Sequence, residues 1–277
     1  MSDRLRRAAV LGKPVAHSLS PVIHNAGYAA AGLSGWSYGR HECAEAELAG
    51  FVAGLDETWA GLSLTMPLKE VALSVADEVS PRASVLGAAN TLYRRDDRWL
   101  AENTDAPGMV DALRWAGVTT AERITVWGAG GTARAALAAA ADLGARQVTV
   151  VARRREAIEA LRPVAARLGV RLAGRDWSDA TDVADHAEVL ISTVPAGVAD
   201  ALVAGWRPAA TAVVFDVLYH PWPTPLAEAA QRAGCAVVSG ADLLLAQAVG
   251  QFELFTGVSA PVAAMREALD AAIQQRR

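Results

Sequence analysis

The sequence has little cysteine and no long apolar run. Cys43 and Cys235 are its only cysteines, and they lie far apart without the spacing of metal ligands. We therefore expect two reduced, partly buried thiols, no metal site and a cytoplasmic protein. No run reaches the roughly 18 apolar residues that a membrane span needs. The arginine-rich residues 1–9 lead into no hydrophobic segment, so we expect no signal peptide.

The charge balance disfavours one class of partner. The formal net charge is −4, which argues against non-specific binding of nucleic acid. Hydrophobic residues make up 52% and charged residues 20%, so the chain can bury a core. A length of 277 residues suits two domains of ordinary size or one large one.

The first part of the chain alternates strand-like and helix-like segments, which predicts a mostly parallel sheet. Strands are expected at 7–12, 36–42 and 59–66, with helices at 21–31, 46–55 and 68–79. A short helical connector at 80–87, a hairpin over 90–101 and a helix at 107–115 follow.

A second alternation begins at residue 123. Strands are expected near 123–127, 147–152, 188–193, 212–218 and 235–238, with a weaker candidate at 170–172, and helices at 131–142, 155–168 and 225–232. The apolar strands are typical of a sheet that is buried on both faces. Two closing helices, 241–255 and 261–275, are expected to pack on the first domain. The fold class is thus α/β, with a first domain of residues 1–104 and 241–277 and a Rossmann-type domain of residues 105–240.

A glycine turn suggests a dinucleotide site. Gly128–Ala133 follows an apolar strand and opens an alanine-rich helix. In that context glycines allow a pyrophosphate to approach the backbone and the N-terminus of the helix. A tight turn without a ligand remains the alternative.

The next strand ends with Ala152, Arg153 and Arg154 and carries no acid that would bind a ribose 2′-hydroxyl. Arginines suit a 2′-phosphate instead. The alternative is a solvated start of a helix. A polar loop at 192–197 also follows a strand, where open α/β sheets place ligands.

Motifs in the first half are more specific. They are Gly12–Asn25, Leu64–Lys69, Gly87–Leu92 and Asn103–Asp105, followed after the glycine turn by Tyr219–Thr224 and Ser239–Gln247. Together these segments resemble the shikimate dehydrogenase family from residue 12 to residue 247, in the order of the family.

The resemblance implies reversible reduction of 3-dehydroshikimate to shikimate with NADPH, in the pathway to chorismate and the aromatic amino acids. It implies Lys69 and Asp105 as the catalytic pair. It implies these substrate contacts: Ser18, Ser20, Thr65, Asn90, Tyr219 and Gln247. It implies these cofactor contacts: Gly128, Ala129, Gly130, Gly131, Thr132, Ala133, Arg153, Arg154, Thr193 and Gly240. No nucleic acid, membrane or metal partner is expected, and the sequence leaves a homodimer open.

The chemistry of a ketone reduction fits the implied pair. The carbon needs a hydride and the oxygen needs a proton, which the protein must give or relay. A charged Lys69 polarises the carbonyl, and Asp105 holds the lysine and balances its charge. Because a free lysine has a pKa of about 10.4, Lys69 is either perturbed in the oxidation direction or passes its proton through the pair. Taken alone, Lys69 would be an exposed helix lysine, Asp105 a helix cap and Ser20 the cap of the helix that begins with Pro21.

Three positions depart from the family pattern. Ser63 and Ala152 stand where asparagine is frequent, and Leu243 stands where methionine is usual. The first departure puts one substrate or strand-end hydrogen bond in doubt, and the second removes an adenosine contact. Three rival interpretations remain: an NAD-dependent quinate/shikimate dehydrogenase, a non-catalytic shikimate-binding regulatory homologue and a generic two-domain Rossmann protein.

Overall fold

The structure is a computed structural model that describes residues 5–276. The first four residues of the arginine-rich start, considered above as a targeting segment, lie outside the described residues. The chain forms two compact units. Unit one comprises Met1–Thr104 and Leu244–Arg277, and unit two comprises Asp105–Leu243.

Unit one is built on a six-stranded mixed sheet in the order β2-β1-β3-β5-β6-β4. β1 pairs in parallel with β2 and β3, and β4 pairs in parallel with β6, whereas β5 is antiparallel to β3 and β6. The strands are β1 (Arg6–Gly12), β2 (Trp36–Glu42), β3 (Trp59–Leu64), β4 (Glu78–Val79), β5 (Thr91–Arg95) and β6 (Arg98–Glu102). The helices are α1 (Ser20–Ala30), the 3₁₀ turn η1 (Glu45–Glu47), α2 (Leu48–Ala53), α3 (Ala72–Val75), α4 (Pro81–Leu86), α11 (Gly240–Thr256, which begins in unit two) and α12 (Val262–Gln274).

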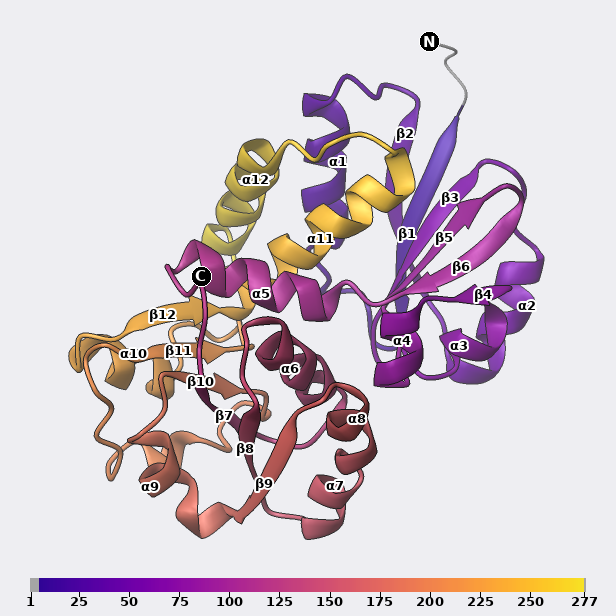
Figure 1. The fold of residues 1–277 in the computed structure, drawn as a ribbon. Coiled ribbons are helices and arrows are strands. Elements are labelled where there is room, and N and C mark those ends of the chain that lie inside the picture. Colours follow the sequence, from indigo (N-terminus) through magenta and orange to yellow (C-terminus); the bar gives the residue numbers. More distant parts are fainter. Residues whose placement is uncertain (1–4, 277) are drawn as a thin grey trace. The chain divides into compact units, whose positions relative to one another are not determined.

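Helices cover both faces of this sheet. Figure 1 shows α1 and α12 on one side and α2 and α3 on the other, and α12 packs along α1. The return of the last helices to the first part of the chain is therefore as predicted. Leu11, Leu62 and Leu92 are fully buried beneath α2 and α3. Apolar burial of this kind contributes about 25 cal/mol per Å² and holds the strand ends, which carry the polar residues, in fixed positions.

Unit two is an all-parallel six-stranded sheet in the order β12-β11-β10-β7-β8-β9. Its strands are β7 (Arg123–Trp127), β8 (Gln147–Ala152), β9 (Arg171–Asp176), β10 (Val189–Ser192), β11 (Val213–Asp216) and β12 (Ala236–Ser239). Its helices are α5 (Asp105–Trp115), α6 (Gly131–Asp142), α7 (Arg155–Glu159), α8 (Arg162–Arg167), η2 (Trp177–Asp179), α9 (Ala180–Ala184), η3 (Asp200–Leu202) and α10 (Pro225–Arg232). α6, α7 and α8 lie on one side of the sheet and α9 and α10 on the other (Figure 1). This doubly wound arrangement confirms the predicted Rossmann-type fold.

The predicted helix over 68–79 is largely wrong. Residues 66–71 form a turn, α3 is one turn long, and residues 78–79 form β4. The carbonyl of Lys69 accepts a hydrogen bond from the backbone N–H of Ala89 at 2.8 Å, and the N–H of Leu73 bonds to Glu70 instead. Because Ala89 takes the carbonyl that an α-helix would give to Leu73, the backbone turns away at this point.

The predicted helix over 155–168 is two helices. Pro163 has no N–H for the carbonyl of Glu159, so α7 ends there and α8 begins at Arg162 with proline in its first turn. The weak strand candidate at 170–172 corresponds to the longer edge strand β9, which pairs with β8. Its polar residues gave no apolar pattern from which its full length could be predicted. The five-residue helix α9 lies in a gap between strands for which no helix bounds were predicted.

Candidate active site

Buried polar side chains gather where β5 begins in unit one. Asn90, Thr104 and Gln247 are all at most 8% exposed. Asn90 Nδ2 donates to Thr104 Oγ1 at 2.9 Å and to Gln247 Oε1 at 3.4 Å, and Asn90 Oδ1 accepts from the Thr104 N–H at 2.7 Å. The structure thus brings together two of the predicted substrate contacts, Asn90 and Gln247.

A second layer of the same cluster contains Ser63, the position that departs from the family pattern. The Ser63 hydroxyl donates to Gln251 Oε1 at 2.6 Å and accepts from the Tyr38 hydroxyl. Gln251 Nε2 donates to the carbonyl of Asn90 at 3.1 Å and to Thr91 Oγ1 at 3.0 Å. The sequence did not predict Tyr38 or Gln251 as residues of this cluster. Ser63 and Gln251 lie 188 residues apart, and no local pattern signals such a contact.

The start of α1 differs from the expectation. The cap position is Leu19 and no side chain caps the helix, so the prediction of Ser20 as the cap is wrong. Instead the N–H of Ser20 donates to Ser18 Oγ at 3.3 Å. Ser20 is buried whereas Ser18 is half-buried, so the two predicted carboxylate contacts have different surroundings.

Thr65 lies directly after β3 beside the end of β1. Its N–H donates to the carbonyl of Leu11 at 2.9 Å. A Cβ on Gly12 would approach Thr65 Cγ2 to 2.3 Å, so only glycine permits this contact. The contact fixes Thr65 at the carboxyl ends of β1 and β3.

The predicted catalytic pair is divided between the units. Lys69 is half-buried in the turn after β3, and it is not a helix lysine. Asp105 is 8% exposed and opens α5, where the positive end of the helix dipole favours a carboxylate. Tyr219 is half-buried in the loop after β11, so it belongs to unit two, whereas the other predicted substrate contacts belong to unit one.

The glycine turn lies at the carboxyl end of β7, as expected. Gly128 has a φ of +105°, and a Cβ there would approach Thr193 Oγ1 to 2.4 Å. Thr193 Oγ1 donates to the carbonyl of Trp127 at 2.9 Å, which holds it against the turn. At Gly130 and Gly131 a Cβ would meet nothing within 4 Å, so open space faces both residues.

The space at Gly130 belongs to a hollow of about 550 Å³ at the carboxyl ends of β7, β8 and β10. Six of the predicted cofactor contacts line it: Gly128, Ala129, Gly130, Arg153, Arg154 and Thr193. Gly131, Thr132, Ala133 and Gly240 do not line it. Gly240 has a packing role, because a Cβ there would lie 2.1 Å from the carbonyl oxygen of Val217. Trp177 also lines the hollow, and sequence reasoning missed it because it follows the polar strand β9.

The charges of this hollow suit an anion. Arg153 and Arg154 are exposed, and no ion pair engages either side chain within residues 5–276. Glycine N–H groups, the N-terminus of α6 and two guanidinium groups form a donor set that fits a pyrophosphate and a 2′-phosphate. The residues present therefore fit NADP.

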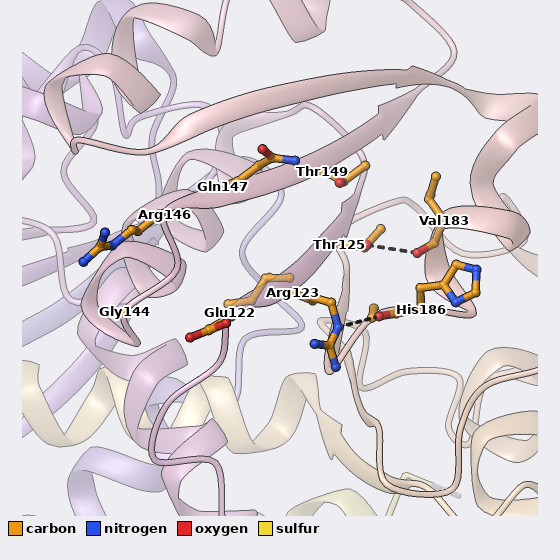
Figure 2. A pocket seen from close by; sticks show the side chains of 11 residues that line it. Glu122, Arg123, Thr125, Gly144, Arg146, Gln147, Thr149, Val183 and His186 are labelled. Atoms are coloured by element: carbon orange, nitrogen blue, oxygen red, sulfur yellow. Dashed lines mark hydrogen bonds between the residues drawn. The ribbon is translucent and has the colours of Figure 1, made fainter.

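A larger hollow of about 640 Å³ lies elsewhere in unit two. Figure 2 shows Arg123 and Gln147, the first residues of β7 and β8, on its wall, with Arg123 Nε donating to the carbonyl of His186 at 3.1 Å. It is therefore at the amino ends of the strands. Open α/β sheets bind ligands at the carboxyl ends, so this hollow is not the dinucleotide site.

Both cysteines are free and buried, and burial raises the pKa of each thiol. Across residues 5–276, no three His, Cys, Asp or Glu side chains lie together as metal ligands would. No helix in the same range is long and apolar enough to cross a bilayer.

The glycine turn, the arginines and the doubly wound sheet of unit two define the class of dinucleotide-binding α/β oxidoreductases. Residues 123–220 match the family described as NADP oxidoreductase, coenzyme F420-dependent. Residues 10–92 match the shikimate dehydrogenase substrate binding domain, and residues 240–269 match the shikimate 5'-dehydrogenase C-terminal domain.

Comparisons over the whole chain give the same family as these domain matches. The shikimate dehydrogenase (NADP(+)) of Methylobacterium radiotolerans is 39% identical, with 93% of each chain covered. The Mycobacterium tuberculosis shikimate dehydrogenase structure is 44% identical with a TM-score of 0.89, over 96% of this chain and 99% of that one. A shikimate 5-dehydrogenase of Thermus thermophilus, in complex with NADP(H) and shikimate, is 32% identical with a TM-score of 0.84, over 97% and 100% of the two chains. The chain belongs to the shikimate dehydrogenase family.

Proposed function

We propose that this chain reversibly reduces 3-dehydroshikimate to shikimate with NADPH. The observation that carries the proposal is the pairing, in one chain of this family, of the Asn90–Gln247 cluster with a glycine-lined hollow that carries Arg153 and Arg154. The Thermus thermophilus relative holds both NADP(H) and shikimate. When bound, NADPH supplies the hydride for the carbonyl carbon.

The residues of the chain bind and orient the substrate. Ser18, Ser20 and Tyr219 are assigned to its carboxylate, and Thr65, Asn90 and Gln247 to its ring hydroxyls. Asn90 and Gln247 are already joined by a hydrogen bond, so their amides are held in place before the substrate arrives. Preorganised polar groups of this kind lower the entropy cost of reaching a reactive geometry.

Delivery of the proton to the carbonyl oxygen is assigned to Lys69 and Asp105. The lysine ammonium hydrogen-bonds the carbonyl oxygen as negative charge develops on it and gives it a proton. Asp105, which lies at the start of α5, is assigned to balance the lysine charge. Proton transfer of this kind contributes typically about 10²–10⁴-fold to the rate.

Replacement of Lys69 tests this assignment. Lys69→Ala is expected to lower kcat for shikimate oxidation by about 100-fold or more, while the dissociation constant for shikimate, measured by calorimetry, changes by only a few fold. Lys13→Ala removes an exposed lysine of unit one and serves as the matched control. A Lys69→Ala variant with near wild-type kcat would refute the role of Lys69.

NADP preference is assigned to Arg153 and Arg154, against the rival NAD-dependent quinate/shikimate dehydrogenase.

A homodimer and a cytoplasmic location remain predictions; light scattering of the purified chain tests the first. A non-catalytic homologue would bind shikimate without turnover, so the same calorimetry and assay also separate that alternative.

A further inference from the structure

A continuous chain of buried hydrogen bonds lies behind the predicted substrate contacts of unit one. It runs from Tyr38 through Ser63 and Gln251 to Asn90. All four side chains are at most 4% exposed, and Gln251 is fully buried. The chain therefore joins a tyrosine of β2 to a predicted ring-hydroxyl contact without passing through solvent.

The direction of the chain is fixed at Gln251. Its amide faces the backbone carbonyl of Asn90 at 3.1 Å, and a carbonyl can only accept. The NH₂ group must therefore point to Asn90, and the oxygen Oε1 must point to Ser63. The reverse orientation would place two acceptors against each other in a buried site, which is strongly unfavourable.

This orientation determines the role of Ser63. The hydroxyl has a single hydrogen, and Gln251 Oε1 takes it at 2.6 Å. The Ser63 oxygen in turn accepts from Tyr38, whose pKa is raised by burial, so Tyr38 keeps its proton and remains a donor. Ser63 consequently has no hydrogen to offer to a substrate.

Gln251 holds the start of β5 at two points. Its NH₂ group donates to the carbonyl of Asn90 and to Thr91 Oγ1, and Thr91 Oγ1 donates to Asn90 Oδ1 at 2.9 Å. The carbonyl of Asn90 also accepts from the N–H of Leu64 at 2.7 Å. Gln251 thus holds the backbone of Asn90 directly, and it holds the side-chain oxygen of Asn90 through the hydroxyl of Thr91.

We propose that Gln251 is a positioning residue that acts through Asn90, and that the Ser63 hydroxyl is closed to the substrate. The proposal rests on the proposed function of this chain and goes beyond it by assigning a role to a residue of α11 that does not contact the substrate. It also resolves the departure at Ser63: the serine serves Gln251 and makes no bond to the substrate.

The test is a double-mutant cycle with steady-state kinetics and calorimetry. Gln251→Leu is expected to raise KM for shikimate about tenfold, to change kcat less than about threefold and to leave KM for NADP⁺ unchanged. In an Asn90→Ala background the same substitution is expected to change KM for shikimate less than about twofold, because the amide side chain that Gln251 positions is gone. An equal effect in both backgrounds would overturn the proposal.

Single hydroxyl deletions complete the test. Ser63→Ala is expected to raise KM for shikimate less than about threefold, and a rise of tenfold or more would show a direct substrate bond. Tyr28→Phe is the control for the loss of a buried hydroxyl, because Tyr28 is buried and its hydroxyl has no hydrogen-bond partner in the described part of the chain.

Two further measurements keep the result interpretable. If Gln251→Leu does not fold, Gln251→Met replaces it, since methionine is unbranched and fits irregular cores. Wild-type protein is assayed first: absence of shikimate turnover there refutes the proposed function. With an active wild type, an unchanged shikimate KM and dissociation constant in the Gln251 variant overturn only the positioning role.

Discussion

Protonation of His24 is predicted to couple the stability of unit one to pH. The imidazole is fully buried in α1 and stacks on Tyr38, with ring centroids 4.2 Å apart and planes 4° from parallel. Burial lowers the pKa of His24 from 6.5 to about 3. In the unfolded chain the same group has a pKa of about 6.5.

The sign follows from proton binding. Between these two pKa values the unfolded state binds a proton that the folded state does not, so stability is lost as pH falls through this window. At about 1.4 kcal/mol per pH unit, His24 alone should remove about 2 kcal/mol from the free energy of unfolding between pH 7.5 and pH 5. The magnitude depends only on the folded-state pKa lying below about 4.

The assay compares wild type with His24→Phe, which keeps an aromatic ring in the stack. Because the chain has two compact units, urea unfolding is followed by pulse-labelling hydrogen exchange of the peptide that covers α1. The variant is expected to lose about 2 kcal/mol less than wild type between the two pH values. His41→Phe replaces an exposed histidine of the same unit and is the matched control. Parallel pH dependences for wild type and His24→Phe would refute the reasoning.

Two other predictions concern unit two. Replacing Arg153 and Arg154 together with alanine should raise KM for NADPH by at least about tenfold, since charge-assisted hydrogen bonds contribute about 1.5–3 kcal/mol each, and should leave KM for NADH nearly unchanged. Arg155→Ala, adjacent but outside the hollow, is the control, and equal losses for both cofactors would contradict the assignment. Gly128→Ala should lower Tm and raise KM for NADP⁺ more than Gly144→Ala does. Both glycines have positive φ, but only at Gly128 does a Cβ meet another atom, Thr193 Oγ1 at 2.4 Å; equal effects of the two variants would show that backbone strain alone matters.

Local signals explain which parts of the fold the sequence could predict. The turn at Gly128–Ala133 combines an apolar strand, glycines and an alanine helix within a short segment, so its structure was predictable, and α6 begins at Gly131 as expected. By contrast, the turn over 66–71 and the short helix α3 depend on a hydrogen bond from the N–H of Ala89 to the carbonyl of Lys69. A pattern of neighbouring residues cannot reveal a contact between residues that far apart in the sequence.

The candidate site was predictable in its residue types and less so in its connections. Asn90 and Gln247 were named from the sequence, and their contact is present. The roles of Tyr38 and Gln251 were not, because they arise where α1, β2, β3 and α11 meet. The cap at Ser20 was wrong because Ser20 is already the first residue of the helix and Leu19 holds the cap position.

The central claim is that this chain oxidises shikimate with NADP⁺ as the acceptor. The most direct measurement follows the absorbance of the reduced nicotinamide with purified protein, for shikimate and quinate, each with NADP⁺ and NAD⁺. We predict the highest kcat/KM for shikimate with NADP⁺, by at least about tenfold over the other three pairs, given the two arginines of the hollow. Absence of turnover with shikimate, or equal turnover with NAD⁺, would contradict the account.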